Sequence, residues 1–255
     1  MKYLIISDIH GNYIALKEVL KEAEKYGWDE VLILGDIVGY YPYPNEVVKE
    51  VRKLLNGNKL YKDAIIRGNH DKVCSGIEEG YTFNNNAYRS AMWTKEFLRP
   101  KNRKFLYELP KGPKRINDLI TICHGSPMDE DYYILYEQDA FASFYSVETQ
   151  FCFFGHTHIP GLFELDTQSG NFSYFIPKDT SLFKLNMDEK YKYLINPGSV
   201  GQPRDYNPKA AFVIFDSDSG VLLFKRTKYN IDSVMRKVQK DNLPIFLAER
   251  LKSGV

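Results

Sequence analysis

Five short polar stretches contain every histidine of the chain, and each follows an apolar run. The central stretch is Gly68-Asn69-His70-Asp71, which closes the run Ala64 to Ile66. An amide, an imidazole and a carboxylate side by side are poor material for a core, because buried polar groups are costly without partners. They are suited to holding a metal ion beside a phosphate. The sequence therefore predicts a fold that brings the five stretches to one point.

The candidate donors combine oxygen and nitrogen and include no thiolate. They are Asp8, His10, Asp36, Asn69, His124, His156 and His158. Such a set favours Mn, Fe, Zn, Co or Ni over Ca or Mg, and the residue types do not choose among those five metals. The donors outnumber what one four-coordinate zinc needs, so we expect two divalent ions that share a carboxylate. Two such ions with two aspartates leave a local positive charge, which a hydroxide and a phosphodiester would neutralise.

Each stretch alone has an ordinary structural explanation as a helix cap, a turn or a satisfied buried histidine. Five histidines scattered through a chain would not be expected to fall only at strand ends, each beside Gly, Asp or Asn. Together the stretches therefore indicate a two-metal centre. Such a centre clamps the attacking and leaving oxygens of a phosphoester.

The surrounding sequence predicts the elements that position these side chains. Buried strands are expected at 2–7, 30–34, 64–67, 119–123 and 151–154. Helices are expected to begin near Asn12 and Pro44 and again near Glu137. Strands that alternate with helices predict a mainly parallel sheet, and ligands bind beyond the carboxyl ends of such strands. The polar stretches lie at those ends.

The rest of the chain predicts a second sheet and two helical segments. Alternating runs at 161–166, 171–176 and 181–185 suggest an antiparallel second sheet. The runs at 210–216 and 221–227 suggest a hairpin. Residues 75–117 are expected to form a helical excursion over the site, where Phe83 and Trp93 could stack on a nucleobase or anchor helices in a core. Residues 231–255 are expected to be helical. We expect a single domain over residues 1–255.

Composition limits the partners and the compartment. The 34 Lys and Arg residues nearly balance the 33 Asp and Glu residues, so no global field would collect a nucleic-acid polymer or an anionic membrane. No run resembles a secretory signal or a membrane span. Three cysteines without C-x-x-C spacing agree with a reducing compartment. We therefore expect a cytoplasmic protein.

The polar stretches together resemble the five-motif signature of the calcineurin-like metallophosphoesterases. The matching motifs are Asp8-x-His10, Gly35-Asp36-x-Val38-Gly39, Gly68-Asn69-His70-Asp71, His124-Gly125 and Gly155-His156-x-His158. The turn Asn196-Pro197-Gly198-Ser199 resembles one that often follows them in this family. The resemblance implies an α/β fold, a four-layer αββα sandwich of two mixed sheets flanked by helices, with a dinuclear metal site at the strand carboxyl ends.

The resemblance also implies a role for each motif residue. One metal would be held by Asp8, His10 and His158, the other by Asn69, His124 and His156, with Asp36 bridging them. His70 would protonate or polarise the leaving oxygen, with Asp71 orienting it and raising its pKa. A metal-bound hydroxide would attack the phosphorus in line, without a covalent intermediate.

Within the superfamily the chain resembles small bacterial and archaeal phosphoesterases and relatives of diadenosine tetraphosphatases. Asn12, Arg67 and Arg204 fit that subgroup and are candidate substrate-binding residues. Arg204 could bind a phosphate bidentately, although a surface pair with Asp205 explains it equally well.

We therefore expect a metal-dependent phosphoesterase, either a phosphodiesterase or a phosphatase, that acts on a small or nucleotide substrate. A phosphoprotein phosphatase is one alternative. Another is a non-catalytic scaffold, as in the related retromer subunit, which would be expected to have lost ligands and especially the histidine at position 70. In a third, the aromatic segment 75–117 is a partner-binding face, which could coexist with catalysis.

Overall fold

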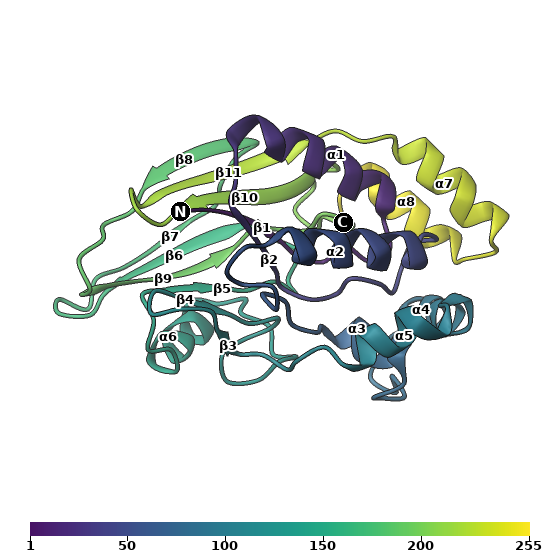
Figure 1. The fold of residues 1–255 in the computed structure, drawn as a ribbon, viewed down its shortest axis with the longest axis horizontal. Coiled ribbons are helices and arrows are strands. Elements are labelled where there is room, and N and C mark those ends of the chain that lie inside the picture. The colour runs from purple at the N-terminus through teal and green to yellow at the C-terminus, as the bar shows by residue number, and fades with distance from the viewer.

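Two mixed β-sheets pack face to face in the computed structural model, which describes residues 1–255 (Figure 1). The order in the five-stranded sheet is β2 (Glu30–Ile33), β1 (Lys2–Ile6), β10 (Ala210–Asp216), β11 (Val221–Thr227) and β8 (Thr180–Lys184). The order in the six-stranded sheet is β3 (Lys114–Arg115), β4 (Ile120–Ile122), β5 (Phe151–Phe153), β9 (Tyr191–Asn196), β6 (Gly161–Asp166) and β7 (Phe172–Phe175). The pairs β1–β2, β4–β5 and β5–β9 are parallel and the others are antiparallel.

Helices cover the outer faces and one end of the two sheets (Figure 1). Helices α1 (Tyr13–Ala23) and α2 (Pro44–Gly57) lie on the five-stranded sheet, and α6 (Glu137–Tyr145) lies on the six-stranded sheet. A short 3₁₀ helix, η1 (Glu24–Tyr26), extends α1. The remaining helices gather at the end of the sheets shown on the right of Figure 1: α3 (Asn69–Ser75), α4 (Asn85–Phe97), α5 (Pro100–Tyr107), α7 (Ile231–Lys240) and α8 (Ile245–Ser253).

The alternation of side chains in β1 explains the layering. Leu4 and Ile6 point into the core that the five-stranded sheet shares with α1 and α2. Tyr3 and Ile5 point the other way, into the core between the two sheets, where Phe215 also lies. Because successive strand residues face opposite sides, one fully buried strand supplies both cores. A third core lies under α6, so the predicted four-layer αββα sandwich is confirmed.

One predicted strand and two predictions about the sheets were wrong. Neither sheet is mainly parallel, because antiparallel pairs outnumber parallel pairs in both. Residues 64–67 form no strand: a single parallel bridge joins Ile65 to Ile33, and the Arg67 N–H donates to the Pro110 carbonyl instead of continuing the sheet. The run at 181–185 does form a strand, β8, but it pairs with β11 at the edge of the five-stranded sheet. Alternation shows that a run is a half-buried strand, and it carries no information about which sheet the strand joins.

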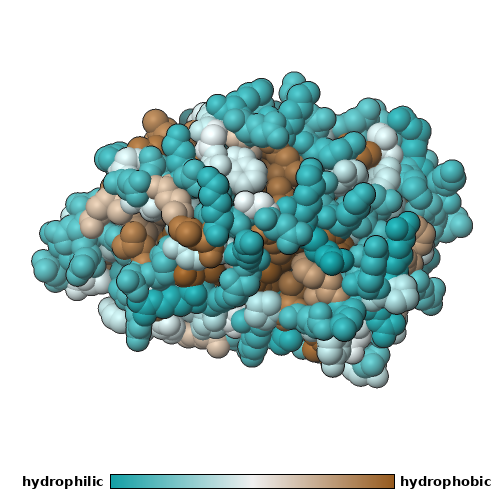
Figure 2. All heavy atoms as spheres, in the orientation of Figure 1, coloured by the Kyte–Doolittle hydropathy of each residue, from teal (hydrophilic) through white to brown (hydrophobic).

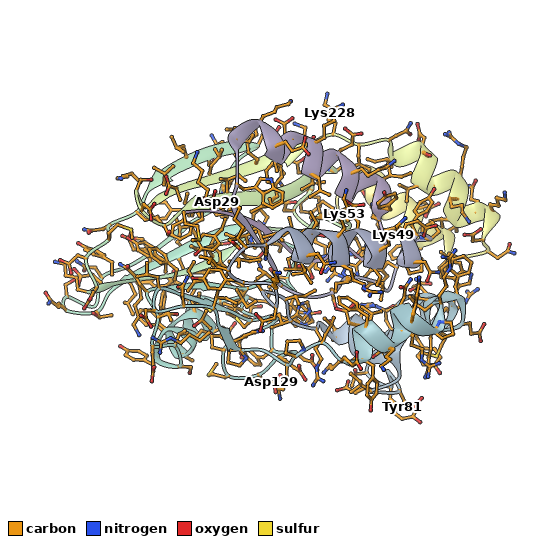
Figure 3. All side chains as sticks on the ribbon, in the orientation of Figure 1. Asp29, Lys49, Lys53, Tyr81, Asp129 and Lys228 are labelled. Atoms are coloured by element: carbon orange, nitrogen blue, oxygen red, sulfur yellow. The ribbon has the colours of Figure 1, made fainter.

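The molecular surface is mostly polar on the face shown in Figure 2, with smaller apolar patches between the charged side chains. Figure 3 shows Tyr81 and Asp129 projecting outward at the lower edge, well away from the buried core. None of the helices combines the length and the apolar character that crossing a membrane would require.

Candidate metal centre

The predicted donors meet where strands of both sheets end. Asp8 and His10 follow β1, Asp36 follows β2, and His124 follows β4. His156 and His158 follow β5 in the same way. All of these side chains are buried, and Asn69 at the start of α3 is partly buried. Polar side chains concentrated in a protein interior need partners, so this burial indicates a built site.

The backbone of the site is held in an unusual conformation. Left-handed φ values occur at Asp8 (53°), His10 (51°), Asp36 (50°), His156 (65°) and His158 (61°). Such values cost free energy in residues that have a Cβ, about 1 kcal/mol or more each, and they concentrate at functional sites. The strand ends therefore turn sharply enough to aim these side chains inward. The site also requires glycine at position 68, because a Cβ added there would lie 2.7 Å from Cγ of Asp36.

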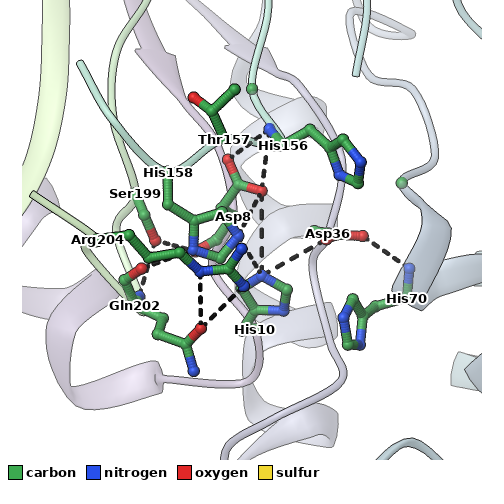
Figure 4. A network of polar contacts seen from close by, with 12 residues as sticks. Asp8, His10, Asp36, His70, His156, Thr157, His158, Ser199, Gln202 and Arg204 are labelled. Carbon is green, nitrogen blue, oxygen red and sulfur yellow. Dashed lines mark hydrogen bonds and ion pairs between the residues drawn. The ribbon is translucent and has the colours of Figure 1, made fainter. Parts of the chain in front are cut away.

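One group of donors contains Asp8, His10, Asp36 and His158, whose ligand atoms all lie within 4.8 Å of one another (Figure 4). His158 Nε2 lies 3.3 Å from Asp8 Oδ1, and His10 Nε2 lies 3.5 Å from Asp36 Oδ2. Buried His10 Nδ1 has no hydrogen-bond partner in the protein. Two carboxylates and two imidazoles at this spacing fit a divalent transition metal.

A second group contains Asp36, His124 and His156. His124 Nε2 lies 3.5 Å from Asp36 Oδ2 and 3.3 Å from Asn69 Oδ1. Asp36 belongs to both groups, which is the position that a bridging carboxylate must occupy. The structure thus brings all seven predicted donors together.

Main-chain carbonyls orient three of the imidazoles. His156 Nε2 lies 3.0 Å from the Asp131 carbonyl. His124 Nδ1 lies 2.8 Å from the Leu34 carbonyl, and His158 Nδ1 lies 2.6 Å from the Gln202 carbonyl. A carbonyl can only accept, so Nδ1 of His124 and of His158 carries a proton and their Nε2 atoms are directed into the cluster, whereas in His156 Nε2 carries the proton. Such a partner fixes the tautomer of a metal-binding histidine.

The turn at Asn196 to Ser199 supports the same site from the other sheet. The Ser199 hydroxyl donates to the Asp8 carbonyl at 2.8 Å and accepts from the Gln202 N–H at 2.7 Å. It therefore fixes both the loop that carries Asp8 and the carbonyl that orients His158.

The charges of the cluster favour ionised carboxylates and largely neutral imidazoles. Burial opposes ionisation of Asp36, but His124, His70 and His10 outweigh it and hold the pKa of that carboxyl well below its usual value. Burial lowers the pKa of His10, and lowers the pKa of His156 to about 3. His124 differs: burial opposes its protonation, but the charge of Asp36 raises the pKa of His124 to about 10. A metal ion could replace that proton, because it supplies the same positive charge.

His70 lines a cavity of about 540 Å³ beside the cluster. The main-chain N–H of His70 donates to Asp36 Oδ1 at 2.9 Å. The centre of its imidazole lies 4.3 Å from the ring centre of Tyr40 and 4.5 Å from that of Phe83. Its Nδ1 has no partner. Burial lowers the pKa of His70 to about 4, the opposite direction from the predicted one.

The predicted role of Asp71 was wrong. Its carboxylate accepts from the N–H groups of Gly68 at 3.0 Å, Ile37 at 3.0 Å and Val38 at 3.1 Å, and it makes no hydrogen bond to the imidazole of His70. Asp71 therefore joins the loop after β2 to the start of α3. A buried carboxylate beside unpaired main-chain donors satisfies those donors first, and the motif alone does not reveal them.

Two of the three predicted substrate-binding residues have structural partners. Asn12 caps α1 by accepting from the Ala15 N–H at 3.1 Å and donates to the Gly201 carbonyl at 3.0 Å. Arg67 donates twice to Glu130, at 3.1 Å for both nitrogens. Both side chains have partners within the protein and neither lines the cavity, so their role in substrate binding stays a prediction.

Arg204 does line the cavity. Its guanidinium donates to Gln202 Oε1 at 3.1 Å (Figure 4). It also donates to the Tyr40 hydroxyl at 3.4 Å. The alternative of a surface pair with Asp205 is excluded, because the Asp205 carboxylate pairs with Arg226.

The cavity residues that sequence reasoning missed include Tyr40, Tyr133 and Arg250. Tyr133 stacks on His156 with ring centres 3.8 Å apart, and it follows the His124-Gly125 motif closely enough that the motif could have drawn attention to it. Arg250 lies on α8, far from every motif in the sequence, and no local signal marks it.

Residues 1–220 match the family model described as the calcineurin-like phosphoesterase superfamily domain. An uncharacterized protein of Methanocaldococcus jannaschii, MJ0912, is 35% identical to the chain, covering 98% of this chain and 97% of its own length. A crystal structure of a metallophosphoesterase from Sphaerobacter thermophilus is 36% identical, with a TM-score of 0.86, and the alignment covers 100% of this chain and 99% of that one.

The hypothetical protein PH1004 from Pyrococcus horikoshii OT3 shares the fold at 22% identity, with a TM-score of 0.78 over 100% of this chain and 98% of its own. The family match spans all seven donors together with His70. The chain belongs to the calcineurin-like phosphoesterase superfamily.

Proposed function

We propose that this protein hydrolyses a small or nucleotide phosphoester with the help of two divalent transition-metal ions. The observation that carries the proposal is the pair of buried donor groups that share Asp36 and adjoin a cavity lined by Asn69, His70 and His156. Membership of a phosphoesterase family supports the reaction class.

The residues divide between the two ions as the donor groups suggest. Asp8, His10 and His158 would hold one ion, Asn69, His124 and His156 the other, and Asp36 both. When bound, such ions supply Lewis acidity toward a phosphoryl group and water. Neutral Asn69 contributes a ligand without reducing the positive charge that attracts the phosphoryl oxygens.

His70 would act on the leaving oxygen. Its ring borders the cavity and is neutral without substrate, because burial holds its pKa near 4. An anionic phosphoester in the cavity would raise that pKa, since a nearby negative charge favours the imidazolium. His70 can then donate a hydrogen bond or a proton as negative charge develops on the leaving oxygen.

A non-catalytic scaffold of the same fold is less consistent with these residues. A scaffold has no need for a complete donor set or for an imidazole that lines the cavity, and this chain retains both. The cavity of about 540 Å³, bordered by Phe83 and Asn84 next to α4, suits a small ligand better than a phosphoprotein surface.

Activity and metal content together test the proposal. Protein reconstituted with Mn should hold close to two metal equivalents and hydrolyse bis-p-nitrophenyl phosphate. A panel of nucleotides, dinucleoside polyphosphates, cyclic nucleotides and phosphopeptides would then rank the substrate classes. Full metal loading without turnover of any phosphoester would favour the scaffold.

A further inference from the structure

Two arginines line the cavity without an Asp or Glu partner. Arg204 comes from the loop after β9, and Arg250 comes from α8 near the end of the chain. Neither guanidinium forms an ion pair with an Asp or Glu within 4.0 Å. Arg204 donates only to neutral groups, and Arg250 donates through Nε to the main-chain oxygen of Val255. The charge of Arg204 is therefore uncompensated, and the charge of Arg250 is balanced by no acidic side chain.

The acidic residues of the same cavity pair with other cations. Asp131 and Glu78 both pair with Lys72, at 2.5 and 2.8 Å, and Glu130 beside them pairs with Lys72 and Arg67. Because those carboxylates are occupied, they do not balance the two arginines. The metal ions proposed above would make the cavity still more positive.

The two guanidiniums repel each other electrostatically. Burial lowers the pKa of Arg250, and the charge of Arg204 lowers it further. An anion between the arginines and the metal centre would relieve this repulsion.

A hydrogen-bonded chain links Arg204 to α8, the helix that carries Arg250. Gln202 Oε1 accepts from Arg204, and Gln202 Nε2 donates to the Tyr41 hydroxyl at 3.0 Å. That hydroxyl donates to the Leu247 carbonyl on α8 at 3.1 Å. The buried apolar residues of α7 and α8 pack on Tyr40 and Tyr41, so the helix that carries Arg250 is docked on the loop after β2. The two side chains are therefore presented by elements that are already fixed to each other, which reduces the ordering cost of binding.

We propose that Arg204 and Arg250 form a second anion subsite, and that the preferred substrate carries a second phosphate or a carboxylate besides the phosphoester that is hydrolysed. The inference rests on the proposed function and narrows its substrate class. Guanidinium groups suit this role because their planar donors match phosphate and carboxylate oxygens. On this basis α7 and α8 serve specificity, since they supply Arg250 to a site built by the preceding motifs.

Matched ligands test the subsite by competition with bis-p-nitrophenyl phosphate. Fructose 1,6-bisphosphate is compared with fructose 6-phosphate, and 3-phosphoglycerate with glycerol 3-phosphate. We expect the ligand with the additional anion to inhibit at about tenfold lower concentration or better, as charge-assisted hydrogen bonds would give. The pair that shows the larger ratio distinguishes a second phosphate from a carboxylate.

Arg250→Gln should abolish that ratio by weakening the doubly anionic ligand. Arg250→Lys keeps the charge without the planar fork and should retain part of the ratio. Arg236→Gln, an exposed arginine of α7, is the matched control and should keep the whole ratio. Thermal unfolding of each variant checks that it is folded.

A wild-type ratio near one would overturn the inference, as would an Arg250→Gln variant that weakens both members of a pair equally. Titration calorimetry of fructose 1,6-bisphosphate provides a readout that does not depend on turnover. If the metal-loaded protein turned over no phosphoester, the proposed function would fail, and calorimetry would still report whether the two arginines bind the second anion.

Discussion

The imidazoles of His10 and His158 face each other through their Nε2 atoms, 3.1 Å apart, in the interior of the protein. His158 presents an Nε2 lone pair because its Nδ1 is bonded to a carbonyl, so His10 must donate if the two nitrogens are to attract each other. A divalent ion would accept lone pairs from both rings at once. A bound ion would therefore stabilise the cluster that contains both rings.

Metal addition should accordingly stabilise the folded protein. A ligand that binds only the native state adds about 2.7 kcal/mol to the free energy of unfolding at a concentration 100 times its Kd. We expect the midpoint of thermal unfolding to rise with Mn and to fall after chelation. A midpoint that is insensitive to Mn, Zn and Co would contradict a site assembled from these seven donors.

Asp36→Asn should remove at least one of the two metal equivalents, because Asp36 is the only residue common to both donor groups. The amide keeps the shape but loses the negative charge that two cations would share. Metal content by mass spectrometry measures the effect. Asp118→Asn is the control, since that side chain is 98% exposed and pairs only with Arg115. Retention of two equivalents by Asp36→Asn would refute the bridging role.

Removing Asp71 should destabilise the fold. Asp71→Ala leaves the N–H groups of Gly68, Ile37 and Val38 buried without an acceptor, at a cost of about 1–3 kcal/mol per unsatisfied group. Urea unfolding of the metal-free protein measures the loss. Asp71→Asn keeps one acceptor oxygen and should recover part of it. Full stability of Asp71→Ala together with a displaced pH–rate profile would instead point to the pairing with His70 that the motif suggested.

Much of the architecture could be predicted from the sequence because burial and periodicity act locally. The strands at β1, β2, β4 and β5 were each predicted to within about two residues, a normal uncertainty for element ends. The assignment of β8 to a sheet could not be predicted, because it depends on pairing with β11 about forty residues later. The residues of a strand do not indicate which distant strand it pairs with.

The candidate site divides in the same way. The motifs were enough to predict which residues could bind metal and that they follow strands. The structure brings those side chains together. The partners of Asn12, Arg67 and Asp71 were not visible, because each bonds to groups that only the fold brings near. Arg250 was missed for the same reason, since α8 reaches the cavity only through its docking on Tyr41.

Glu130 should make stability depend on pH. Burial opposes its ionisation, but the hydrogen bonds from Arg67 and the charge of Lys72 outweigh it, so the pKa of Glu130 lies below its usual 4.5. A depressed pKa means that the stabilisation is present above about pH 4.5 and is lost as pH falls through the lowered value. Glu130→Gln should cost about 3 kcal/mol at pH 7, because Lys72 and Arg67 lose a buried partner.

Urea unfolding at pH 7 and near pH 3 measures this difference for the metal-free protein. The gap between wild type and Glu130→Gln should narrow at the lower pH, where the wild-type carboxyl also becomes neutral. Since Glu130 is next to Asp131, whose carbonyl lies 3.0 Å from His156 Nε2, the variant should also loosen the loop over the metal centre. A gap that is constant with pH would show that the pairing does not contribute through charge.

His70→Gln should slow the hydrolysis of esters with poor leaving groups by roughly 10²- to 10⁴-fold, the usual contribution of a general acid. Nitrophenyl esters need little protonation and should be spared. Metal content should be unchanged, because His70 belongs to neither donor group. Equal losses for both classes of ester would remove this role from His70.

Gly39 offers a way to disturb His70 without replacing it. Gly39 has a φ of 133°, and a Cβ added there would lie 2.8 Å from Cγ of the His70 ring. The Cβ added by Gly39→Ala must therefore displace the imidazole. The left-handed backbone at this position also disfavours an L side chain. We expect it to impair esters with poor leaving groups more than nitrophenyl esters, as His70→Gln does, while two metal equivalents remain bound.

The matched control is Gly57→Ala at the end of α2, where an added Cβ has no heavy atom within 4 Å. The double variant Gly39→Ala, His70→Gln completes a cycle: if Gly39 acts by positioning His70, the second change should add little to the first. Independent, additive losses would mean that Gly39→Ala distorts the loop that carries Asp36, and they would be accompanied by a fall in metal content. Metal analysis of the same samples therefore separates a displaced imidazole from a damaged metal centre.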